Sequence, residues 1–282
     1  MPNSNIEAKK VLKAKPKLSA KEFVRERPEV PMAIGLLVVF LSGWELIVHI
    51  FDVPIIMVPA PSDIYYSLAD NLTSISFLYH FWVTFSEVVA GFILGASVGL
   101  LLGGFIGEFR LLEKTVYPYI VALQTVPKVA VAPIIVIWFG FGITSKIVIA
   151  AMIAFFPVLA NTIVGLHAAP ADQLELLRAY TATRWQIFFK LKIPQALPYI
   201  FVGLNVAIVL AVIGAIVGEF VGAQAGLGYL IMQRNFSMDM AGTFAILVVL
   251  SAMGFSLHAI IQRAQKIIVF WMESEDDNTT GA

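Results

Sequence analysis

The sequence of 282 residues contains no cysteine and few charged side chains. Without cysteine no disulfide can form, so the redox state of the compartment has no bearing on the fold. Charged residues make up 13% of the chain, about half of their share in a typical soluble domain, and hydrophobic residues make up 59%. This composition predicts a protein whose bulk lies in a lipid bilayer.

The sequence also lacks motifs that mark nucleotide-binding and metal-dependent catalytic sites. It has no G-x-x-x-x-G-K-[ST] phosphate loop and no H-E-x-x-H motif. Its four histidines are scattered along the chain, so we expect packing or interface roles for them rather than a metal site. We predict no catalytic residue, no enzymatic activity and no cofactor in this chain.

Apolar runs long enough to cross a bilayer occur six times. A spanning helix needs about 20 mainly apolar residues to cross a core about 30 Å thick. Such windows lie near residues 32–50, 81–107, 117–141, 147–166, 198–221 and 242–262. We predict an all-α membrane protein with six transmembrane helices. Its expected parts are a basic tail (1–31), a transmembrane domain (32–270) and an acidic tail (271–282).

The distribution of Lys and Arg predicts the orientation of these spans. Of the 19 Lys and Arg residues, all but three fall on one side of the six-span topology. The other side holds Lys146 and Arg234, and Lys128 lies within the third span. Cytoplasmic loops carry an excess of positive residues. We therefore expect both termini, and the loop between spans four and five, in the cytoplasm. On the outer face, Ser62 is expected to cap a short amphipathic helix.

Small residues and prolines divide the spans into two kinds. The second span has glycine at every fourth position from 91 to 107, and the fifth has Gly and Ala at similar spacing. Such faces let another helix backbone approach closely. Four prolines interrupt the third and fourth spans, and a broken membrane helix indicates a solute pathway; these are Pro118, Pro127, Pro133 and Pro157.

Lys128 follows Pro127 near the middle of the third span, where a charge costs at least about 2.5 kcal/mol and should face the bundle interior. It has three interpretations: an internal ion pair with Glu87, Glu219 or Glu45, attraction of an anionic solute, or extension of its ammonium to the membrane surface. The other polar groups available inside the bundle complete a predicted solute pathway: Gln124, Thr125, Asn161, Asn205 and Glu219.

The basic loop between spans four and five, residues 168–196, has the pattern of two short helices joined by a turn. Thr183 and Gln186 have capping-box spacing for the start of the second helix, and Pro194 is expected to close its end. A helical hairpin with apolar anchors and a basic rim, held outside the membrane, is suited to bind another protein.

This hairpin resembles the EAA loop of ABC importer permeases, in which Glu-Ala-Ala is followed by Gly and, further on, by Ile, one residue and Leu-Pro. Aligning Pro194 with the family proline places Glu175 at the Glu and Thr181 at the Gly. Leu176 and Leu177 replace the two alanines. Because a β-branched residue is costly at positive φ, we expect the turn at Thr181 to be built differently.

Three further strings narrow the resemblance to type I permeases of the nitrate, sulfonate, taurine and pyrimidine-precursor group. They are "VPAPSDI", "PKVAVAPIIVIWFGFG" and "VGEFVGAQAGLGYLI". The resemblance implies a bacterial inner-membrane permease that forms a pore with a second copy. It also implies an ATP-binding cassette ATPase pair, which would hold ATP and Mg²⁺, and an external solute-binding protein.

The resemblance gives the hairpin residues a role in coupling to the ATPase: Glu175, Arg178, Thr181, Arg184 and Trp185. The expected function is alternating-access import of a small solute, with an organic anion favoured by Lys128. Nitrate, bicarbonate and a pyrimidine precursor stay open as solutes. The rival interpretation is a secondary transporter or channel that acts without an ATPase, and it does not explain the hairpin.

Overall fold

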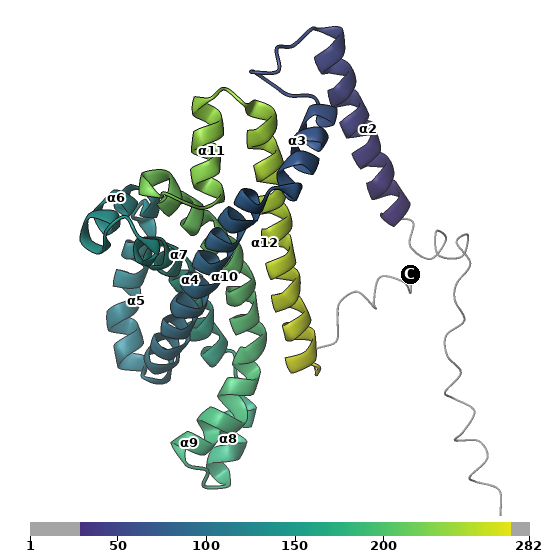
Figure 1. Ribbon diagram of the computed structural model, residues 1–282. Coiled ribbons are helices and arrows are strands. Elements are labelled where there is room, and N and C mark those ends of the chain that lie inside the picture. The colour runs from purple at the N-terminus through teal and green to yellow at the C-terminus, as the bar shows by residue number, and fades with distance from the viewer. Residues whose placement is uncertain (1–28, 272–282) are drawn as a thin grey trace, which may run out of the picture. The chain divides into compact units, whose positions relative to one another are not determined.

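The computed structural model describes residues 29–271, and this part of the chain consists of helices and short connections without a strand (Figure 1). This agrees with the predicted all-α fold class. The predicted tails, residues 1–31 and 271–282, fall almost wholly outside the described residues. The chain divides into two compact units, Met1–Ser62 and Asp63–Ala282, which are described in turn.

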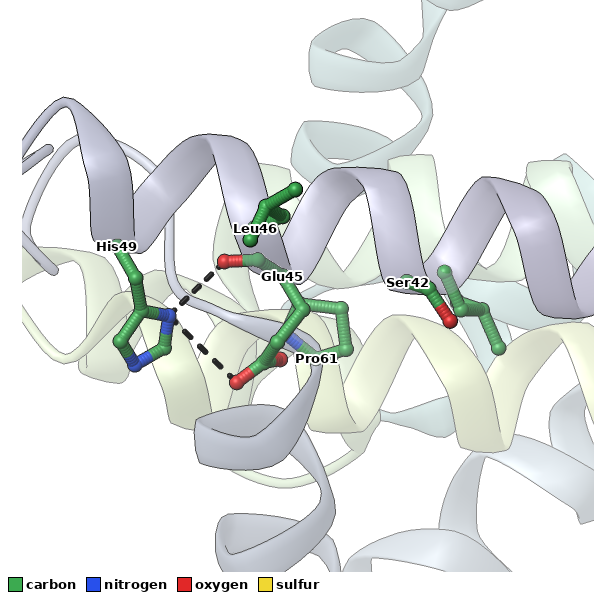
Figure 2. A pocket seen from close by; sticks show the side chains of 6 residues that line it. Ser42, Glu45, Leu46, His49 and Pro61 are labelled. Atoms are coloured by element: carbon green, nitrogen blue, oxygen red, sulfur yellow. Dashed lines mark hydrogen bonds and ion pairs between the residues drawn. The ribbon is translucent and has the colours of Figure 1, made fainter.

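The first unit contains α2 (Glu29–Ile50) and the first two residues of α3 (Pro61–Thr73). The Glu45 carboxylate accepts hydrogen bonds from the Ser62 backbone N–H at 3.0 Å and from the Ser62 hydroxyl at 2.7 Å. Figure 2 shows His49 one turn further along α2, with Nδ1 2.9 Å from the Glu45 carbonyl oxygen. Our expectation that Ser62 caps α3 is wrong, because the helix begins at Pro61 and Ser62 binds Glu45 instead.

The second unit contains the rest of α3 and all later helices. These are α4 (Ile75–Glu108), α5 (Arg110–Thr125), α6 (Lys128–Phe139), α7 (Ile143–His167), α8 (Ala171–Ala179), α9 (Arg184–Ile187), the π-helical turn η1 (Phe188–Lys192), α10 (Ile193–Gly222), α11 (Leu227–Phe236) and α12 (Met240–Ile268). Figure 1 shows α8 and α9 beyond one end of α10, and α11 beside its other end.

Among the described residues, five helices are long and apolar enough to cross a membrane. They are most of α2 (Val30–Ile50), then α4, α7, α12 and the continuous run Arg184–Gly222 that α9, η1 and α10 form together. The pair α5 and α6 also passes this test, but the chain bends by 91° between the two helices. The prediction of six spans therefore holds when the bent pair counts as one crossing.

The prolines of the third and fourth spans behave differently from one another. The break between α5 and α6 falls at Val126 and Pro127, as a broken third span requires. Pro118, Pro133 and Pro157 lie inside α5, α6 and α7 without ending them. A single proline removes one backbone donor, and neighbouring helices can compensate for that loss in a membrane protein. The prediction that all four prolines interrupt their helices is wrong for these three.

The second unit is built around α7, which packs against α4 on one side and α10 on the other. All five glycines of the predicted α4 stripe are buried and face α7. On α10, Gly203, Gly214 and Gly218 also face α7. An added Cβ would crowd the α7 backbone or side chains at each of these positions. The two glycine faces thus let three helix backbones approach closely, as their spacing predicts.

This packing predicts opposite outcomes for two glycines of α4. A Cβ at Gly99 would lie 2.9 Å from the Phe155 carbonyl oxygen, whereas a Cβ at Gly104 meets no atom within 4 Å. We expect Gly99→Leu to lower the free energy of unfolding by ~1–3 kcal/mol or more through overpacking. Gly104→Leu, the matched control, should unfold like the wild type. Thermal unfolding of the detergent-purified chain measures both, and equal melting temperatures for the two variants would contradict the packing.

Candidate functional site

The basic hairpin consists of α8, a turn at residues 180–183, and α9. Thr183 and Gln186 form the predicted capping box, in which the Gln186 N–H donates to Thr183 Oγ1 and the Thr183 N–H donates to Gln186 Oε1. The hairpin residues that were assigned to ATPase coupling all have exposed side chains: Glu175, Arg178, Thr181, Arg184 and Trp185. The hairpin therefore presents these side chains on a free surface of the described chain.

The aromatic residues of this hairpin form a cluster on that surface. The Trp185 ring stacks on the Phe189 ring with 6.0 Å between the centroids, and Phe188 meets both rings edge-on. Trp185 is 70% exposed and Phe189 is 62% exposed. Large exposed aromatic side chains in contact with one another are a common feature of protein interfaces.

The turn after α8 keeps the conformation that the family glycine would favour. Thr181 has φ of +57°, in the left-handed region. Its N–H donates to the Arg178 carbonyl at 2.9 Å, and the Ala182 N–H donates to the Leu177 carbonyl at 3.0 Å. This is a Schellman motif, which glycine usually completes. The expectation of a different turn is wrong, and the β-branched residue carries strain of ~1–3 kcal/mol.

The second helix of the hairpin does not end at Pro194, so that expectation is also wrong. The Ile193 N–H donates to the Phe188 carbonyl five residues back, and helical structure then runs on to Gly222. The wider π-helical turn accommodates the missing N–H of Pro194. Arg184 and Trp185 are therefore the first residues of one helical rod, Arg184–Gly222, which we call the α10 rod.

An ion pair joins the α10 rod to α4 next to the hairpin. Lys192 Nζ lies 2.7 Å from Glu108 Oε2, and both side chains are largely shielded from solvent. A partly buried pair is screened less by salt than one on an open surface. It fixes the end of α4 to the start of the rod.

Four of the six predicted pathway residues line one cavity of 620 Å³. These are Gln124 and Thr125 at the end of α5, Lys128 at the start of α6, and Asn161 on α7. Leu210 of α10 also lines the cavity. The predicted broken helix thus contributes two helix ends to a cavity, as expected for irregular backbone at membrane depth.

Lys128 projects into this cavity without a carboxylate partner. Its Nζ donates to the Gln124 carbonyl at 3.1 Å and lies 5.0 Å from the centre of the Phe156 ring. No carboxylate of residues 63–271 lies within ion-pair distance of it. An ammonium has three donors, and one is used here. The predicted internal ion pair is therefore not seen in this unit, and Glu45 of the first unit binds Ser62.

The other two predicted pathway residues lie elsewhere. Asn205 Nδ2 donates to Gln265 Oε1 at 2.9 Å and so joins α10 to α12. Glu219 is 2% exposed and binds the first turn of α11. Neither residue lines the cavity around Lys128.

The Glu219 carboxylate holds the start of α11. Its Oε2 accepts hydrogen bonds from the N–H groups of Gly228, at 2.5 Å, and Tyr229, at 3.2 Å. Its Oε1 accepts one from the Thr84 hydroxyl at 2.6 Å. The first N–H groups of a helix have no partner within it, and a carboxylate is favoured there by the helix dipole.

Two residues of α4 complete this arrangement. Thr84 Oγ1 accepts a hydrogen bond from the Leu227 N–H at 2.7 Å, and His80 Nδ1 accepts one from the Gly226 N–H at 2.9 Å. Together with Glu219, these side chains bind four successive N–H groups at the start of α11. We call His80, Thr84 and Glu219 the α11 clasp.

Lys146 extends the same region to α7. It is 1% exposed, and its Nζ donates to the Phe141 carbonyl at 2.6 Å and to the Gly222 carbonyl at 3.0 Å. The ammonium thereby links the α6–α7 connection to the far end of the α10 rod. The charge distribution predicts Lys146 on the outer side of the membrane, but no pattern in the sequence predicts this role.

The clasp was not predicted either, although the sequence contains one signal for it. Gly226 has φ of +118°, and a Cβ there or at Gly228 would collide with the Glu219 side chain. The glycines of the string "AGLGYLI" therefore mark a helix start that a side chain approaches closely.

Residues 89–273 match the family described as binding-protein-dependent transport system inner membrane component. The chain belongs to this family. It is therefore the permease subunit of an ABC importer, an inner-membrane component with several spans, and ATP hydrolysis belongs to its partner ATPase. This excludes the rival interpretation of a transporter that acts without an ATPase.

Individual relatives match most of the chain. The formylaminopyrimidine transport permease protein ThiX of Halalkalibacterium halodurans is 35% identical over 232 residues, which cover 82% of this chain and 92% of that protein. The riboflavin transport system permease protein RibX of Chloroflexus aurantiacus is 33% identical over 245 residues, 87% of this chain and 90% of that protein. The fold matches a solved inward-facing structure of the MetNI methionine ABC transporter with a TM-score of 0.59 and 22% identity, over 66% of this chain and 93% of that one.

The clasp predicts a stability effect at a position that faces no cavity. Glu219→Ala leaves the Gly228 and Tyr229 N–H groups without their acceptor, and the Thr84 hydroxyl keeps only its longer contact with the His80 carbonyl, at 3.3 Å. Each unpaired buried donor costs ~1–3 kcal/mol, so we expect a loss of about 3 kcal/mol or more. Glu219→Gln keeps one acceptor oxygen and should lose less. Thermal unfolding and amide hydrogen exchange in α11 measure the effect, and an unchanged exchange rate in the Ala variant would refute it.

Proposed function

We propose that the basic hairpin is the surface through which this permease receives force from its ATPase. The observation that carries the proposal is the exposed aromatic and charged surface of α8 and α9 at the start of one continuous helical rod. Arg184 and Trp185 belong to the rod itself, so a push on the hairpin acts directly on α10. The resemblance of Glu175 and its neighbours to the EAA loop supports the same assignment.

The transport cycle follows from this geometry. Closure of an ATPase pair, with ATP and Mg²⁺ bound in those partners, would bring together the hairpins of this chain and a second permease copy. Packed helices move as rigid bodies, because close-packed interfaces do not deform continuously. Motion of the α10 rod carries α7 with it and shifts the walls of the cavity around Lys128. In this arrangement both termini lie in the cytoplasm, and an external solute-binding protein delivers the solute on the opposite side.

The hairpin assignment predicts the effect of a charge reversal. Glu175→Arg should leave the permease in the membrane and weaken its association with the ATPase by about tenfold or more, as expected for a buried interfacial charge. Gln173→Arg adds the same positive charge two residues away on the same helix, where it faces a different direction, and should have little effect. Co-purification and coupled uptake in vesicles measure both variants. Full coupled transport by the Glu175 variant would count against the assignment.

We further propose that the solute passes the cavity around Lys128 and is a small organic anion. The Lys128 ammonium has no carboxylate partner among residues 63–271 and keeps free hydrogen-bond donors toward the cavity. Gln124 and Asn161 add amide groups to the same cavity. A permease must release what it binds, so a few polar contacts of this kind suffice, and selectivity rests mainly with the solute-binding protein.

A heteroaromatic solute such as a pyrimidine precursor is the second candidate. The Phe156 ring lies in the cavity lining next to Lys128 and offers a surface for stacking. The relatives named above carry the names of a formylaminopyrimidine and of riboflavin. Both candidates fit a cavity with one cation, two amides and one aromatic ring.

Replacement of Lys128 distinguishes the two candidates. Lys128→Met should reduce uptake of an organic anion by about tenfold or more, because a hydrogen bond to a charged group contributes ~1.5–3 kcal/mol. Uptake of an uncharged pyrimidine should change little, and ATPase assembly should persist. Lys114→Met removes an exposed charge outside the cavity and serves as the control. Vesicle uptake of a small panel of both classes is the measurement, and unchanged uptake of every solute would remove Lys128 from the pathway.

A further inference from the structure

A second hollow, distinct from the cavity around Lys128, lies beside the hairpin. It has a volume of 610 Å³ and runs between the last turns of α4 and the first turns of the α10 rod. Its walls are mainly apolar and include Leu101 and Phe105 of α4 and Phe188 and Ile200 of the rod. We call it the α4–α10 groove. Both walls belong to helices that are long and apolar enough to cross a membrane.

Two of the polar side chains that line this groove are satisfied by the protein. The Thr162 hydroxyl on its floor donates to the Val158 carbonyl at 2.7 Å, and Glu108 at its mouth pairs with Lys192 at 2.7 Å. Arg184 also lines the mouth and has an exposed side chain without an ion pair among residues 29–271. The groove thus combines an apolar interior with one uncompensated positive charge at its opening.

The length of the groove fits a single acyl chain. Its α4 wall extends from Leu100 to Phe109, which spans about 14 Å at 1.5 Å per helical residue. One leaflet of a bilayer has a hydrocarbon depth of about 15 Å. Gly104 lies on this wall, and a Cβ there would meet no protein atom within 4 Å. The middle of the groove is therefore open space that a lipid tail of this length can fill.

We propose that the α4–α10 groove binds one acyl chain of an anionic phospholipid, whose phosphate group pairs with the Arg184 guanidinium. Basic pockets between membrane helices on the cytoplasmic side bind anionic headgroups, and a guanidinium matches phosphate geometry. The inference rests on the proposed function in one respect, since that function places the hairpin end of the spans at the cytoplasmic leaflet. A bound lipid contacts both α4 and the hairpin, so it makes the stiffness of this joint depend on membrane composition.

Lipid retention by the full chain tests the proposal without any ATPase. The chain is reconstituted in nanodiscs of equal parts phosphatidylglycerol and phosphatidylcholine, released into detergent and examined by native mass spectrometry. We expect about fivefold more phosphatidylglycerol than phosphatidylcholine to be retained, the ratio that ~1 kcal/mol for one membrane-surface cation gives. Gly104→Leu fills the groove and should abolish this retention. Arg184→Gln keeps the groove open and should retain both lipids equally.

A control variant tests whether lipid loss is specific to the groove. Gly43→Leu adds the same side chain to α2, where a Cβ also meets no atom within 4 Å, and should retain lipid like the wild type.

Equal retention of both lipids by the wild type, or wild-type retention by Gly104→Leu, would overturn the proposal. A groove covered by a second copy of the chain would show no retained lipid in a dimer and would also overturn it. If Gly104→Leu fails to fold, the Arg184→Gln comparison decides alone. Full ATPase binding by Glu175→Arg, with wild-type retention of lipid, would contradict the proposed hairpin function and leave the lipid groove intact.

Discussion

The close approach of α7 to α4 and α10 is the constraint on which the other features depend. Lipid tails are as apolar as leucine side chains, so helices in a bilayer associate through van der Waals contact, and glycine lets two helix backbones approach closely enough to make it. The glycine faces of α4 and α10 hold α7 between them. Because α7 carries Phe156 and Asn161, this packing also places one wall of the cavity. Any movement of α10 must therefore be passed to that wall.

The α10 rod contacts regions of the protein that lie far apart along the chain. At one end it carries the hairpin and the Lys192–Glu108 ion pair, and at the other end Glu219 and Gly222 bind the start of α11 and Lys146. Helical hydrogen bonds run through the whole rod, with a π-helical turn where proline would otherwise leave a gap. A single helical element thus carries the hairpin at one end and contacts the start of α11 at the other.

Sequence periodicity and local chemistry predicted the parts of this structure that depend on near neighbours. The glycine spacing, the Thr183 capping box and the break at Pro127 each involve residues within one or two turns.

Features that depend on distant segments were not predictable. Thr181 takes a glycine conformation because the hairpin around it fixes the turn, and Pro194 stays inside a helix because η1 widens. The clasp joins residues of α4 and α10 that lie 135 positions apart at Thr84 and Glu219, and single-sequence patterns carry no such pairing. The cavity groups four of the six expected polar residues, because Gln124, Thr125 and Lys128 flank the break and Asn161 of α7 faces it.

The bend between α5 and α6 has a consequence for ion leakage. The last residues of α5 and the first residues of α6 border the cavity, so the negative end of one helix dipole and the positive end of the other lie there and oppose each other. The Lys128 ammonium remains as a fixed positive charge, which repels sodium, potassium and hydrated protons. In the alternating-access cycle proposed above, this charge would let the permease admit its solute without dissipating the cation gradients of the cell.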